Sequence, residues 1–555
     1  MSIKKWWKGA IVYQIYPRSF CDSNGDGIGD INGICSKLDY LQQLGITCIW
    51  LSPIFQSPQD DNGYDISDYR AIAPEFGTMA DFENLLKEAH AKGMRVLMDL
   101  VVNHTSDEHQ WFQESRKSKD NPYRNYYIWR DGKADGKPPS DWGSHFRGSA
   151  WEYDEQTDQY YLHLFSKKQP DLNWENPDVR REVQDIIHFW SKKGVDGYRI
   201  DTVAMYSKNM DFPDTGDEHR LAVEHFNDGP KMHDYLQEMF VNCFDPYDAM
   251  TVGEADHIPI ERALLYVGEA RNELSMLFHF EHVSLGGKYE TWAPENITPQ
   301  NLKTIFSRWQ HAMHQGGGWN TLYYSNHDQP RQVSRFGDDE RYWKESAKML
   351  ATILHLQRGT PFVYQGEEIG MMNVPFQRRE YRDIEAINFM NEYEKKYGSV
   401  EPVLEAVAAT SRDNARTPMQ WNAEKNAGFT EGTPWIKIAP NYKSVNVQAE
   451  ETDLDSILNY YRSLIRLRKD HPAIVYGDYQ DYDIDHPQVY LFLRKAKGES
   501  ILVMANMSAE YAAYRLPKEL EREQGEILLT NEESMQLNPK MKLPPYFCSV
   551  YRLFD

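Results

Sequence analysis

The chain has 555 residues, and its 61 basic and 84 acidic side chains give a formal net charge of −23 at neutral pH. A charge of this sign repels nucleic acid and anionic membrane surfaces, which excludes them as expected partners and favours a neutral, hydroxyl-rich ligand. The length exceeds that of a usual single domain and therefore predicts two or three structural units.

Short apolar runs rich in β-branched residues recur along the chain, and helix-like segments follow them. There are eight such runs, at residues 12–17, 47–53, 95–104, 197–202, 249–255, 274–281, 321–328 and 361–368. Amphipathic stretches such as residues 81–93 and 179–194 lie between them, and the second ends in Lys-Lys-Gly, as a helix C-terminus does. Alternation of strand and helix eight times predicts an α/β protein built on a (β/α)8 TIM barrel.

Two excursions and a change of texture divide the chain further. Residues 105–173 follow the third strand, are rich in Trp, Tyr, Asp, Gly and Pro, and predict an inserted loop-rich domain beside the barrel mouth. The barrel is then expected to comprise residues 1–104 and 174–475, with a second excursion at about 370–421 over the same face. Residues 476–555 contain short alternating segments, which predict a C-terminal antiparallel β-sandwich domain.

The cysteines and the N-terminus bear on location. The five cysteines are odd in number and show neither paired short spacing nor a metal-ligand pattern, so free thiols in a reducing compartment are the simplest interpretation. The first ten residues, MSIKKWWKGA, carry positive charge without an apolar run behind it, and no stretch reaches the length of a membrane span. We therefore expect a cytoplasmic protein without membrane contact.

Carboxylates concentrate at the ends of predicted strands, where a β/α barrel places catalysis. Asp201, Glu254 and Asp328 end the fourth, fifth and seventh strands, so a closed barrel directs all three toward one pocket. Glycoside cleavage needs one carboxylate to attack the anomeric carbon and one carboxylic acid to protonate the departing oxygen. The alternative interpretation is that these carboxylates form a structural ion-pair network at the barrel mouth. This interpretation is less favoured because the three carboxylates lie at three separate strand ends.

Arg199 precedes Asp201 by two residues, so strand alternation places both side chains on one face. We expect the guanidinium to lower the pKa of Asp201 and keep it ionised, whereas Glu254 needs an environment that raises its pKa. His104 and His327 also follow strand ends, and neutral imidazoles that donate to sugar hydroxyls are the expected role, with structural histidines as the alternative.

The strand-end motifs closely resemble those of a known family. The α-amylase family, glycoside hydrolase family 13, has signature regions similar to DLVVNH (99–104), GYRID (197–201), VGEA (252–255), SNHD (325–328) and QPDLNWENP (169–177). Three further segments resemble those of the oligo-1,6-glucosidase and α-glucosidase branch of this family. They are YQIYPRSFCDSNGDGIGDINGI (13–34), DNGYDISDY (61–69) and SRDNARTPMQW (411–421). The motifs occur in family order, and the resemblance spans essentially the whole chain.

The resemblance implies retention through a covalent glycosyl-enzyme intermediate. Asp201 would be the nucleophile, Glu254 the acid and then the base, and Asp328 the carboxylate that grips hydroxyls of the sugar in the cleaved position. The residues implied to bind substrate match their motif positions and are Asp61, Tyr64, His104, Arg199, His327 and Arg412, with Thr202 beside the nucleophile.

Two of these assignments concern the shape of the pocket. Tyr64 is expected to stack beneath the sugar ring. Asp61 and Arg412 are expected to bind the non-reducing-end hydroxyls and block the pocket, which makes cleavage exo-acting and favours short substrates. A surface salt bridge between two loops is the alternative role for this pair.

Oxygen-bearing side chains alternate with glycines in one loop near the N-terminus, as a hard cation requires. The opening D-x-N-x-D-G mimics an EF-hand, but the twelfth position is Gly33 instead of Glu, which excludes a true EF-hand. Because the same loop binds Ca²⁺ in relatives, the resemblance implies a structural Ca²⁺ here, with an Asx-rich turn as the alternative. The implied ligands are Asp22, Asn24, Asp26, Ile28 through its carbonyl, and Asp30.

Thr202 bears on the linkage that is cleaved. Members of this branch that prefer α-1,6 linkages tend to have Val at this position, whereas those that accept α-1,4 linkages tend to have Ala or Thr. The resemblance therefore favours maltose and malto-oligosaccharides as substrates, with transglycosylation left open. An oligo-1,6-glucosidase acting on isomaltose is the alternative, because Thr and Val are nearly isosteric and a packing role for Thr202 remains open.

Other functions of the same fold are also considered. Sucrose isomerases that resemble this chain carry an RLDRD loop, whereas residues 335–339 read RFGDD here, which favours a hydrolase over that enzyme or a trehalose synthase. A catalytically silent relative is disfavoured because all three carboxylates are present. A trehalose-6-phosphate hydrolase needs a cationic phosphate pocket, which the sequence does not locate. The oligomeric state and the identity of the metal stay open.

Overall fold

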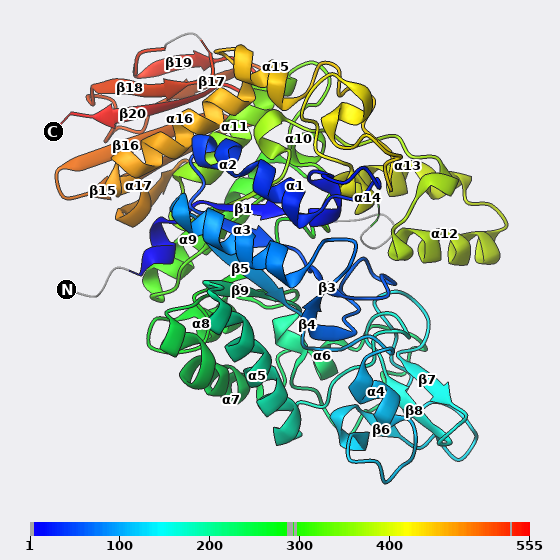
Figure 1. Ribbon diagram of the computed structural model, residues 1–555. Coiled ribbons are helices and arrows are strands. Elements are labelled where there is room, and N and C mark those ends of the chain that lie inside the picture. Colours follow the sequence, from blue (N-terminus) through cyan, green and yellow to red (C-terminus); the bar gives the residue numbers. More distant parts are fainter. Residues whose placement is uncertain (1–4, 286–291, 293–296, 533–534, 555) are drawn as a thin grey trace.

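The structure is a computed structural model that describes residues 5–285, 292, 297–532 and 535–554. Residues 1–4, part of the N-terminal stretch considered above, lie outside the described residues. A barrel occupies the centre of the molecule, with further segments above it and to its lower right (Figure 1). Within the described part of the chain, no helix is long and apolar enough to cross a membrane.

Eight parallel strands form the barrel in the order β11-β10-β9-β5-β2-β1-β13-β12. They are β1 (Val12–Ile15), β2 (Cys48–Leu51), β5 (Arg95–Leu100), β9 (Gly197–Ile200), β10 (Met250–Ala255), β11 (Met276–His279), β12 (Thr321–Leu322) and β13 (Thr360–Tyr364). A parallel bridge between Leu277 and Asn320 joins the two edge strands, so the sheet closes on itself. Each of the eight apolar runs overlaps a barrel strand, and the predicted fold is confirmed.

The strands are mostly apolar because both of their faces are buried. Side chains such as Trp50, Leu97 and Phe278 pack together in one cluster, while neighbours such as Ile49, Met98 and Leu277 belong to a second cluster shared with the helices. The principal helices around the barrel are α2 (Leu38–Leu44), α3 (Met79–Ala91), α5 (Pro177–Lys193), α7 (Met232–Met239), α8 (Ile260–Val267), α9 (Pro299–Gln315), α11 (Trp343–Leu356) and α16 (Ile457–Asp470). Helix α5 ends at Gly194 with φ of 107°, the left-handed C-cap that Lys-Lys-Gly predicts.

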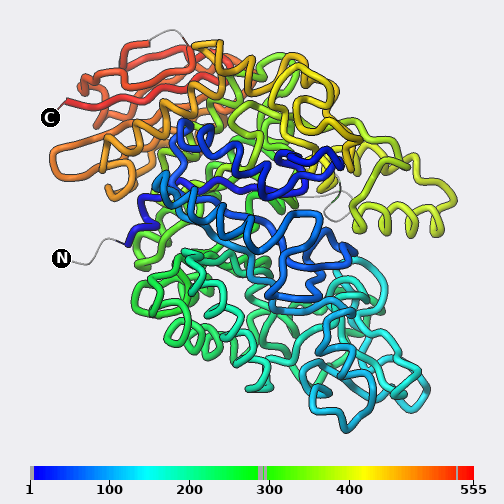
Figure 2. Tube along the Cα trace, viewed as in Figure 1, coloured from blue at the N-terminus to red at the C-terminus, as the bar shows by residue number. Residues whose placement is uncertain are grey.

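Two segments lie on one side of the barrel, the right-hand side of Figures 1 and 2. The segment after β5 contains α4 (Gln110–Ser115) and a three-stranded antiparallel sheet of β6 (Trp129–Arg130), β8 (Gln159–Leu162) and β7 (Trp151–Asp154). The segment after β13 contains α12 (Ile384–Tyr397), α13 (Glu401–Thr410) and α14 (Asp413–Arg416). Helix α4 lies in the segment that was expected to be rich in loops, and its six residues are too few to give a periodic signal in the sequence.

Beyond α16 and α17 (Pro472–Tyr476), the chain forms two antiparallel sheets. One is ordered β14 (Asp478–Tyr482), β15 (Val489–Ala496), β16 (Glu499–Asn506), β20 (Cys548–Leu553) and β18 (Gly525–Thr530), and the other pairs β17 (Ala512–Arg515) with β19 (Lys540–Leu543). Alternate residues of β15 face in opposite directions, with Leu491 packed toward the smaller sheet and Phe492 toward the barrel. The predicted antiparallel β domain is confirmed.

Candidate active site

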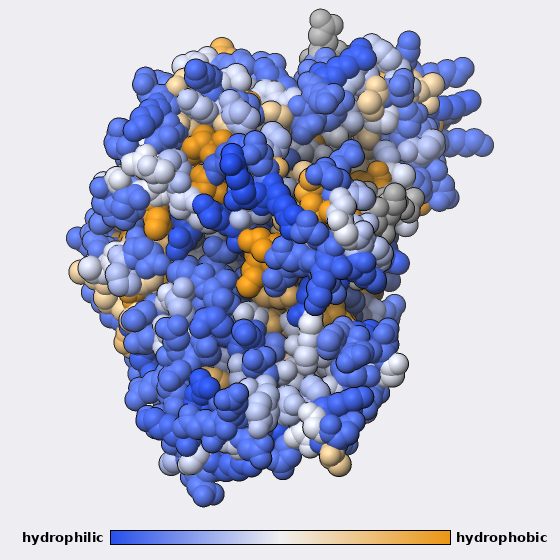
Figure 3. All heavy atoms as spheres, turned by 90° about the vertical axis from the view of Figure 1, so that its right-hand side faces the viewer, coloured by the Kyte–Doolittle hydropathy of each residue, from blue (hydrophilic) through white to orange (hydrophobic). Residues whose placement is uncertain are grey.

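A pocket of about 220 Å³ opens at the carboxyl ends of the barrel strands. Eight of the residues predicted from sequence line it: Asp61, Tyr64, His104, Asp201, Thr202, Glu254, Asp328 and Arg412. Arg199 and His327 do not line the pocket but lie directly behind it, in contact with its carboxylates. The side of the molecule that carries the two added segments is mainly hydrophilic, with small hydrophobic patches near its middle (Figure 3).

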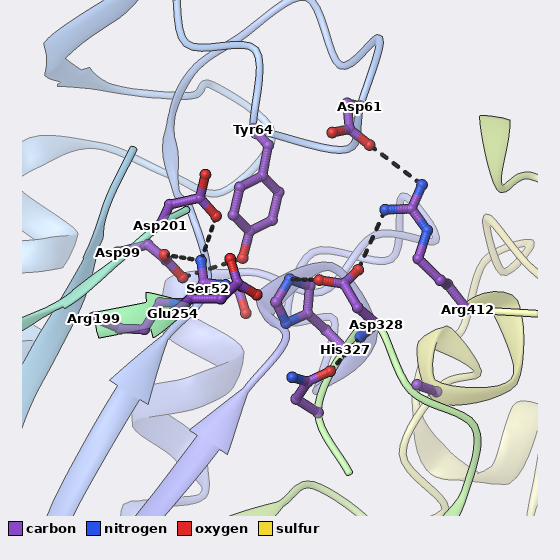
Figure 4. A network of polar contacts seen from close by, with 12 residues as sticks. Ser52, Asp61, Tyr64, Asp99, Arg199, Asp201, Glu254, His327, Asp328 and Arg412 are labelled. Atoms are coloured by element: carbon purple, nitrogen blue, oxygen red, sulfur yellow. Dashed lines mark hydrogen bonds and ion pairs between the residues drawn. The ribbon is translucent and has the colours of Figure 1, made fainter. Parts of the chain in front are cut away.

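Arg199 is the centre of a network of polar contacts at the pocket, as Figure 4 shows. Its Nη1 lies 2.7 Å from Oδ1 of Asp201, and its Nη2 lies 2.7 Å from Oε1 of Glu254. Nη1 also donates to Oδ1 of Asp99 at 2.6 Å. The other oxygen of this carboxylate accepts hydrogen bonds from Trp50 and Tyr64. One buried guanidinium therefore binds three buried carboxyl groups, two of which line the pocket.

Burial controls the protonation of this cluster. It raises the pKa of Glu254 to about 7, and the attraction of Arg199 offsets it only in part, in agreement with the role of an acid near neutral pH. Burial also raises the pKa of Asp201 to about 7; Arg199 lowers this pKa as expected, but not enough to keep it below its usual value, so the expectation that Arg199 holds Asp201 fully ionised is wrong. The loss of hydration and the negative charge of Asp99 outweigh Arg199 at this position. Two adjacent carboxyls of this kind can hold one proton between them around neutral pH.

Thr202 lies between the two carboxyl groups. It follows β9 in the left-handed region, with φ of 39°, and its backbone N–H donates to Oε2 of Glu254 at 3.2 Å. Its hydroxyl donates to Oδ2 of Asp201 at 3.3 Å. The residue that the sequence associates with linkage preference therefore contacts both carboxyl groups.

Asp328 is surrounded by cationic and imidazole groups. Its oxygens lie 2.9 Å from Nε2 of His327, 2.9 Å from Nη2 of Arg416 and 3.3 Å from Nη1 of Arg412. Although burial opposes ionisation, these neighbours hold the pKa of Asp328 well below its usual range. Asp328 is thus an ionised acceptor for hydroxyl groups, unlike the two carboxyls on Arg199.

Arg412 closes one end of the pocket. It lies 3.6 Å from Asp61 and 2.6 Å from Asp383, and all three side chains are largely buried. A pair in this position is part of the pocket wall, so the alternative of a surface salt bridge is wrong. Burial raises the pKa of Asp61 to about 7, although Arg412 partly opposes this.

Tyr64 and His104 form the floor beside this end. The ring of Tyr64 lies parallel to that of His327, with centroids 5.1 Å apart, and its hydroxyl donates to Asp99 at 3.1 Å. Burial lowers the pKa of His104 to about 4, which agrees with the neutral imidazole that was expected. Its Nε2 lies 3.1 Å from the carbonyl oxygen of Tyr64, so a backbone acceptor is already within reach of this nitrogen.

Comparison with known proteins places the chain in a family. The family model described as the alpha amylase catalytic domain matches residues 14–477, and that of the alpha-amylase SusG C-terminal domain matches residues 489–550. The chain belongs to the α-amylase family, glycoside hydrolase family 13. An oligo-1,6-glucosidase of Parageobacillus thermoglucosidasius is 53% identical over 561 residues, which cover 99% of each chain.

Other relatives show how related folds are used. A trehalose-6-phosphate hydrolase of Bacillus subtilis is 47% identical over 552 residues, covering 99% of this chain and 98% of that protein. An isomaltulose synthase variant from Erwinia rhapontici, solved with sucrose, has a TM-score of 0.95 at 44% identity and full coverage of both chains. The enzyme is therefore a glycoside hydrolase of the α-glucosidase and oligo-1,6-glucosidase branch, with an oligosaccharide as substrate.

Sequence reasoning missed part of the pocket wall of this α-amylase-family enzyme. The further lining residues come mostly from loops and from the two added segments: His145, Phe146, Phe165, Ala204, Met205, Asn227, Asp256, Phe280, Gln329 and Glu385. Their apolar members have the sequence signal of ordinary core residues. A buried Lys208 was also missed, and it joins Asp171 at the end of the inserted segment to Asn103 after β5.

The predicted metal loop folds on itself in this family member. Oδ1 of Asp22, Asn24 and Asp26 each accept a backbone N–H two residues ahead, at 2.8–2.9 Å, as in Asx turns. Asp30 instead caps helix α1 (Ile31–Ser36), where its Oδ1 accepts the N–H of Gly33 at 2.7 Å. Among the described residues, no three His, Cys, Asp or Glu side chains gather as a metal-binding group. The donor set is all oxygen, which suits a hard cation, and the second carboxylate oxygen of Asp26 is not engaged by these turns.

Proposed function

We propose that the enzyme is a retaining, exo-acting α-glucosidase that removes single glucose units from short α-glucosides. The observation that carries this proposal is the bridging of Asp201 and Glu254 by one guanidinium and by Thr202. Retaining glycosidases hold their two carboxyl groups only about 5–5.5 Å apart, whereas inverting ones leave room for a water at about 6.5–9.5 Å. Because Asp201 and Glu254 both contact the same guanidinium and the same threonine, they fit the closer separation of retaining enzymes.

The division of labour follows from the surroundings of each group. Asp201 attacks the anomeric carbon and forms the glucosyl-enzyme bond, while Glu254 gives its proton to the departing oxygen. Glu254 then takes a proton from the incoming water, whose oxygen attacks the same carbon and releases Asp201. Asp328, whose pKa its cationic neighbours hold well below the usual range, accepts hydrogen bonds from hydroxyl groups of the glucose that is cleaved.

Exo-action is supported by the closed end of the pocket. The ion pair of Asp61 with Arg412, and the bond of Arg412 to Asp383, leave a wall where a longer chain would have to continue. Only a terminal sugar then fits between this wall and the catalytic carboxyls. The groups on the wall are charged and can exchange hydrogen bonds with the hydroxyls of that sugar.

Two observations bear on the linkage. Several close relatives are oligo-1,6-glucosidases, whereas Thr202 is the residue associated above with acceptance of α-1,4 bonds. The proposal is that both maltose and isomaltose are cleaved and that Thr202 sets their ratio. A phosphorylated sugar fits less well, because among the described residues that line the pocket Arg412 is the one Arg or Lys, against six carboxylic side chains.

The function is tested by following maltose, isomaltose and sucrose separately with anomeric-proton NMR. We expect glucose from the first two sugars, with the α-anomer appearing before mutarotation. β-Glucose appearing first would contradict retention, and isomaltulose formed from sucrose would favour an isomerising enzyme.

Thr202→Val, measured in the same assay, should shift the ratio of isomaltose to maltose cleavage toward isomaltose by about three- to tenfold, since it removes one hydrogen bond to Asp201. Thr202→Ser is the control that keeps the hydroxyl, and an unchanged ratio in the valine variant would refute this role.

We also propose that residues 22–30 bind a structural Ca²⁺ through Asp22, Asn24, Asp26 and Asp30 and the carbonyl of Ile28. CaCl₂ at a large excess over Kd should raise Tm by about 2–5 °C relative to EDTA, because a ligand that binds only the folded state stabilises it. Differential scanning calorimetry measures this, with MgCl₂ as the second arm. Asp26→Ala should abolish the shift, and equal Tm values in CaCl₂ and EDTA would show that the loop holds no ion.

A further inference from the structure

Helix α12 turns one face toward the active site. Residues Glu385, Asn388, Phe389 and Glu392 have the spacing i, i+3, i+4 and i+7, which places them on one side of a helix. Glu385 lines the pocket directly. The other members of this face reach residues 146 and 147 of the inserted segment, far away in the sequence.

The contact between the two segments is built from one hydrogen bond and one arginine. Nδ2 of Asn388 donates to the carbonyl oxygen of Phe146 at 3.1 Å. The guanidinium of Arg147 lies 5.3 Å from the ring centroid of Phe389, and its Nε lies 3.9 Å from Glu392. Neither partner belongs to the barrel, so this contact joins the two parts of the chain that stand over the pocket.

The backbone at this contact is in an unfavourable region. Arg147 has φ of 80°, in the left-handed half of the map, which residues with a side chain rarely adopt because of steric strain. The hydrogen bond from Asn388 ends on the carbonyl of the Phe146–Arg147 peptide, the group whose direction this conformation sets. Asn388 thus stabilises the turn in which Phe146 is presented.

Phe146 in turn forms part of the pocket wall. Its ring is buried, with 7% of the residue exposed, and lies 5.2 Å from the guanidinium carbon of Arg412. Helix α12 holds Arg412 as well, because Asp383, the N-cap of the helix, accepts from Nε and Nη2 of this arginine at 2.9 and 2.6 Å. One helix therefore positions both the arginine at the closed end and the aromatic ring against it.

We propose that Asn388 is a specificity-determining positioning residue, which fixes Phe146 against Arg412 and so keeps the pocket narrow enough for a single terminal glucose. The proposal rests on the exo-acting α-glucosidase activity proposed above. It predicts that loss of the hydrogen bond weakens the binding of a terminal glucose and relaxes the preference for short substrates, while the catalytic carboxyls keep their geometry.

The test compares Asn388→Ala and Asn388→Asp with the matched control Asn391→Ala. Asn391 is an exposed residue one turn further along the same helix, and it accepts a hydrogen bond from Arg378. KM for isomaltose and maltose should rise by about three- to tenfold in both Asn388 variants, the worth of one hydrogen bond, with kcat within about twofold. The kcat/KM for the corresponding tetrasaccharides should fall less than that for the disaccharides. Asn391→Ala should match the parent, and equal Tm values exclude general loosening.

A double-mutant cycle shows whether Asn388 acts through Phe146. In a Phe146→Ala background, Asn388→Ala should cause no further rise in KM, because the ring that it positions is already absent. Additive effects, a fall in kcat at unchanged KM, or the same change in Asn391→Ala would each overturn the proposal. Calorimetric binding of 1-deoxynojirimycin to the same variants separates this result from a failure of the proposed function. If the parent binds the inhibitor but releases no glucose, the proposed activity fails. The ratio of inhibitor Kd between the Asn388 variants and the parent still tests the role of Asn388.

Discussion

Replacing Asp201 with Asn is expected to lower kcat for glucose release by about 10⁴-fold or more, because the amide cannot form the bond to the anomeric carbon. The fold should persist, since Arg199 keeps two buried carboxylates, Asp99 and Glu254, and is not left unpaired. Stopped-flow release of 4-nitrophenol from its α-glucoside measures the loss. Circular dichroism and Tm verify that the variant is folded.

Two controls make the role of Asp201 specific. Asp99→Asn removes the charge of another carboxylate bound to Arg199, one that does not line the pocket. It should therefore reduce kcat far less than Asp201→Asn does. Asp201→Gly opens the space of the nucleophile, and azide added to this variant should attack from that face and give the β-glucosyl azide. Turnover by Asp201→Asn within about 100-fold of the parent would remove this residue as the nucleophile.

The barrel could be predicted from sequence because its strands are buried on both faces. Runs such as residues 95–104 and 249–255 are mostly apolar at successive positions, and polar residues gather toward the carboxyl end of each strand. The same logic explains where boundaries differ. The run at 321–328 contains a strand of only two residues, because Ser325 to Asp328 have left the ladder to supply side chains to the pocket. Strands β17 and β19 are hard to detect in the sequence because they are four residues long, with only two buried positions each.

The site was predictable where a motif places a functional group at a strand end. Asp201, Glu254 and Asp328 are brought together because the barrel directs strand ends to one pocket. The pKa of Asp201 was not predictable, since its direction depends on how deeply the carboxyl is buried beside Asp99. Phe146 and Asn388 were equally hidden, because their positions depend on how two separate segments pack against each other.

Replacing Glu254 with Gln is expected to separate the two chemical steps. Hydrolysis of isomaltose should fall by about 10³-fold, within the range that general acid catalysis contributes, because its leaving alcohol needs a proton. α-Glucosyl fluoride needs no such proton, so its fluoride should leave rapidly in a burst of one equivalent. The second step should then be slow, because water has lost its base. Azide, a nucleophile that needs no base, should restore turnover and give the α-glucosyl azide.

The pH dependence identifies the group that carries the proton. Burial raises the pKa of Glu254 to about 7, so kcat/KM of the parent for isomaltose should fall as the pH rises through this region and the acid loses its proton. At low pH the pair formed by Asp201 and Glu254 takes up a second proton. This proton neutralises Asp201, which can then no longer act as the nucleophile, and so gives the acidic limb of the profile. Glu254→Gln acting on α-glucosyl fluoride should therefore lack the alkaline limb and retain the acidic one. An alkaline limb that persists in this variant would assign the proton to another group, because Gln cannot titrate in this range.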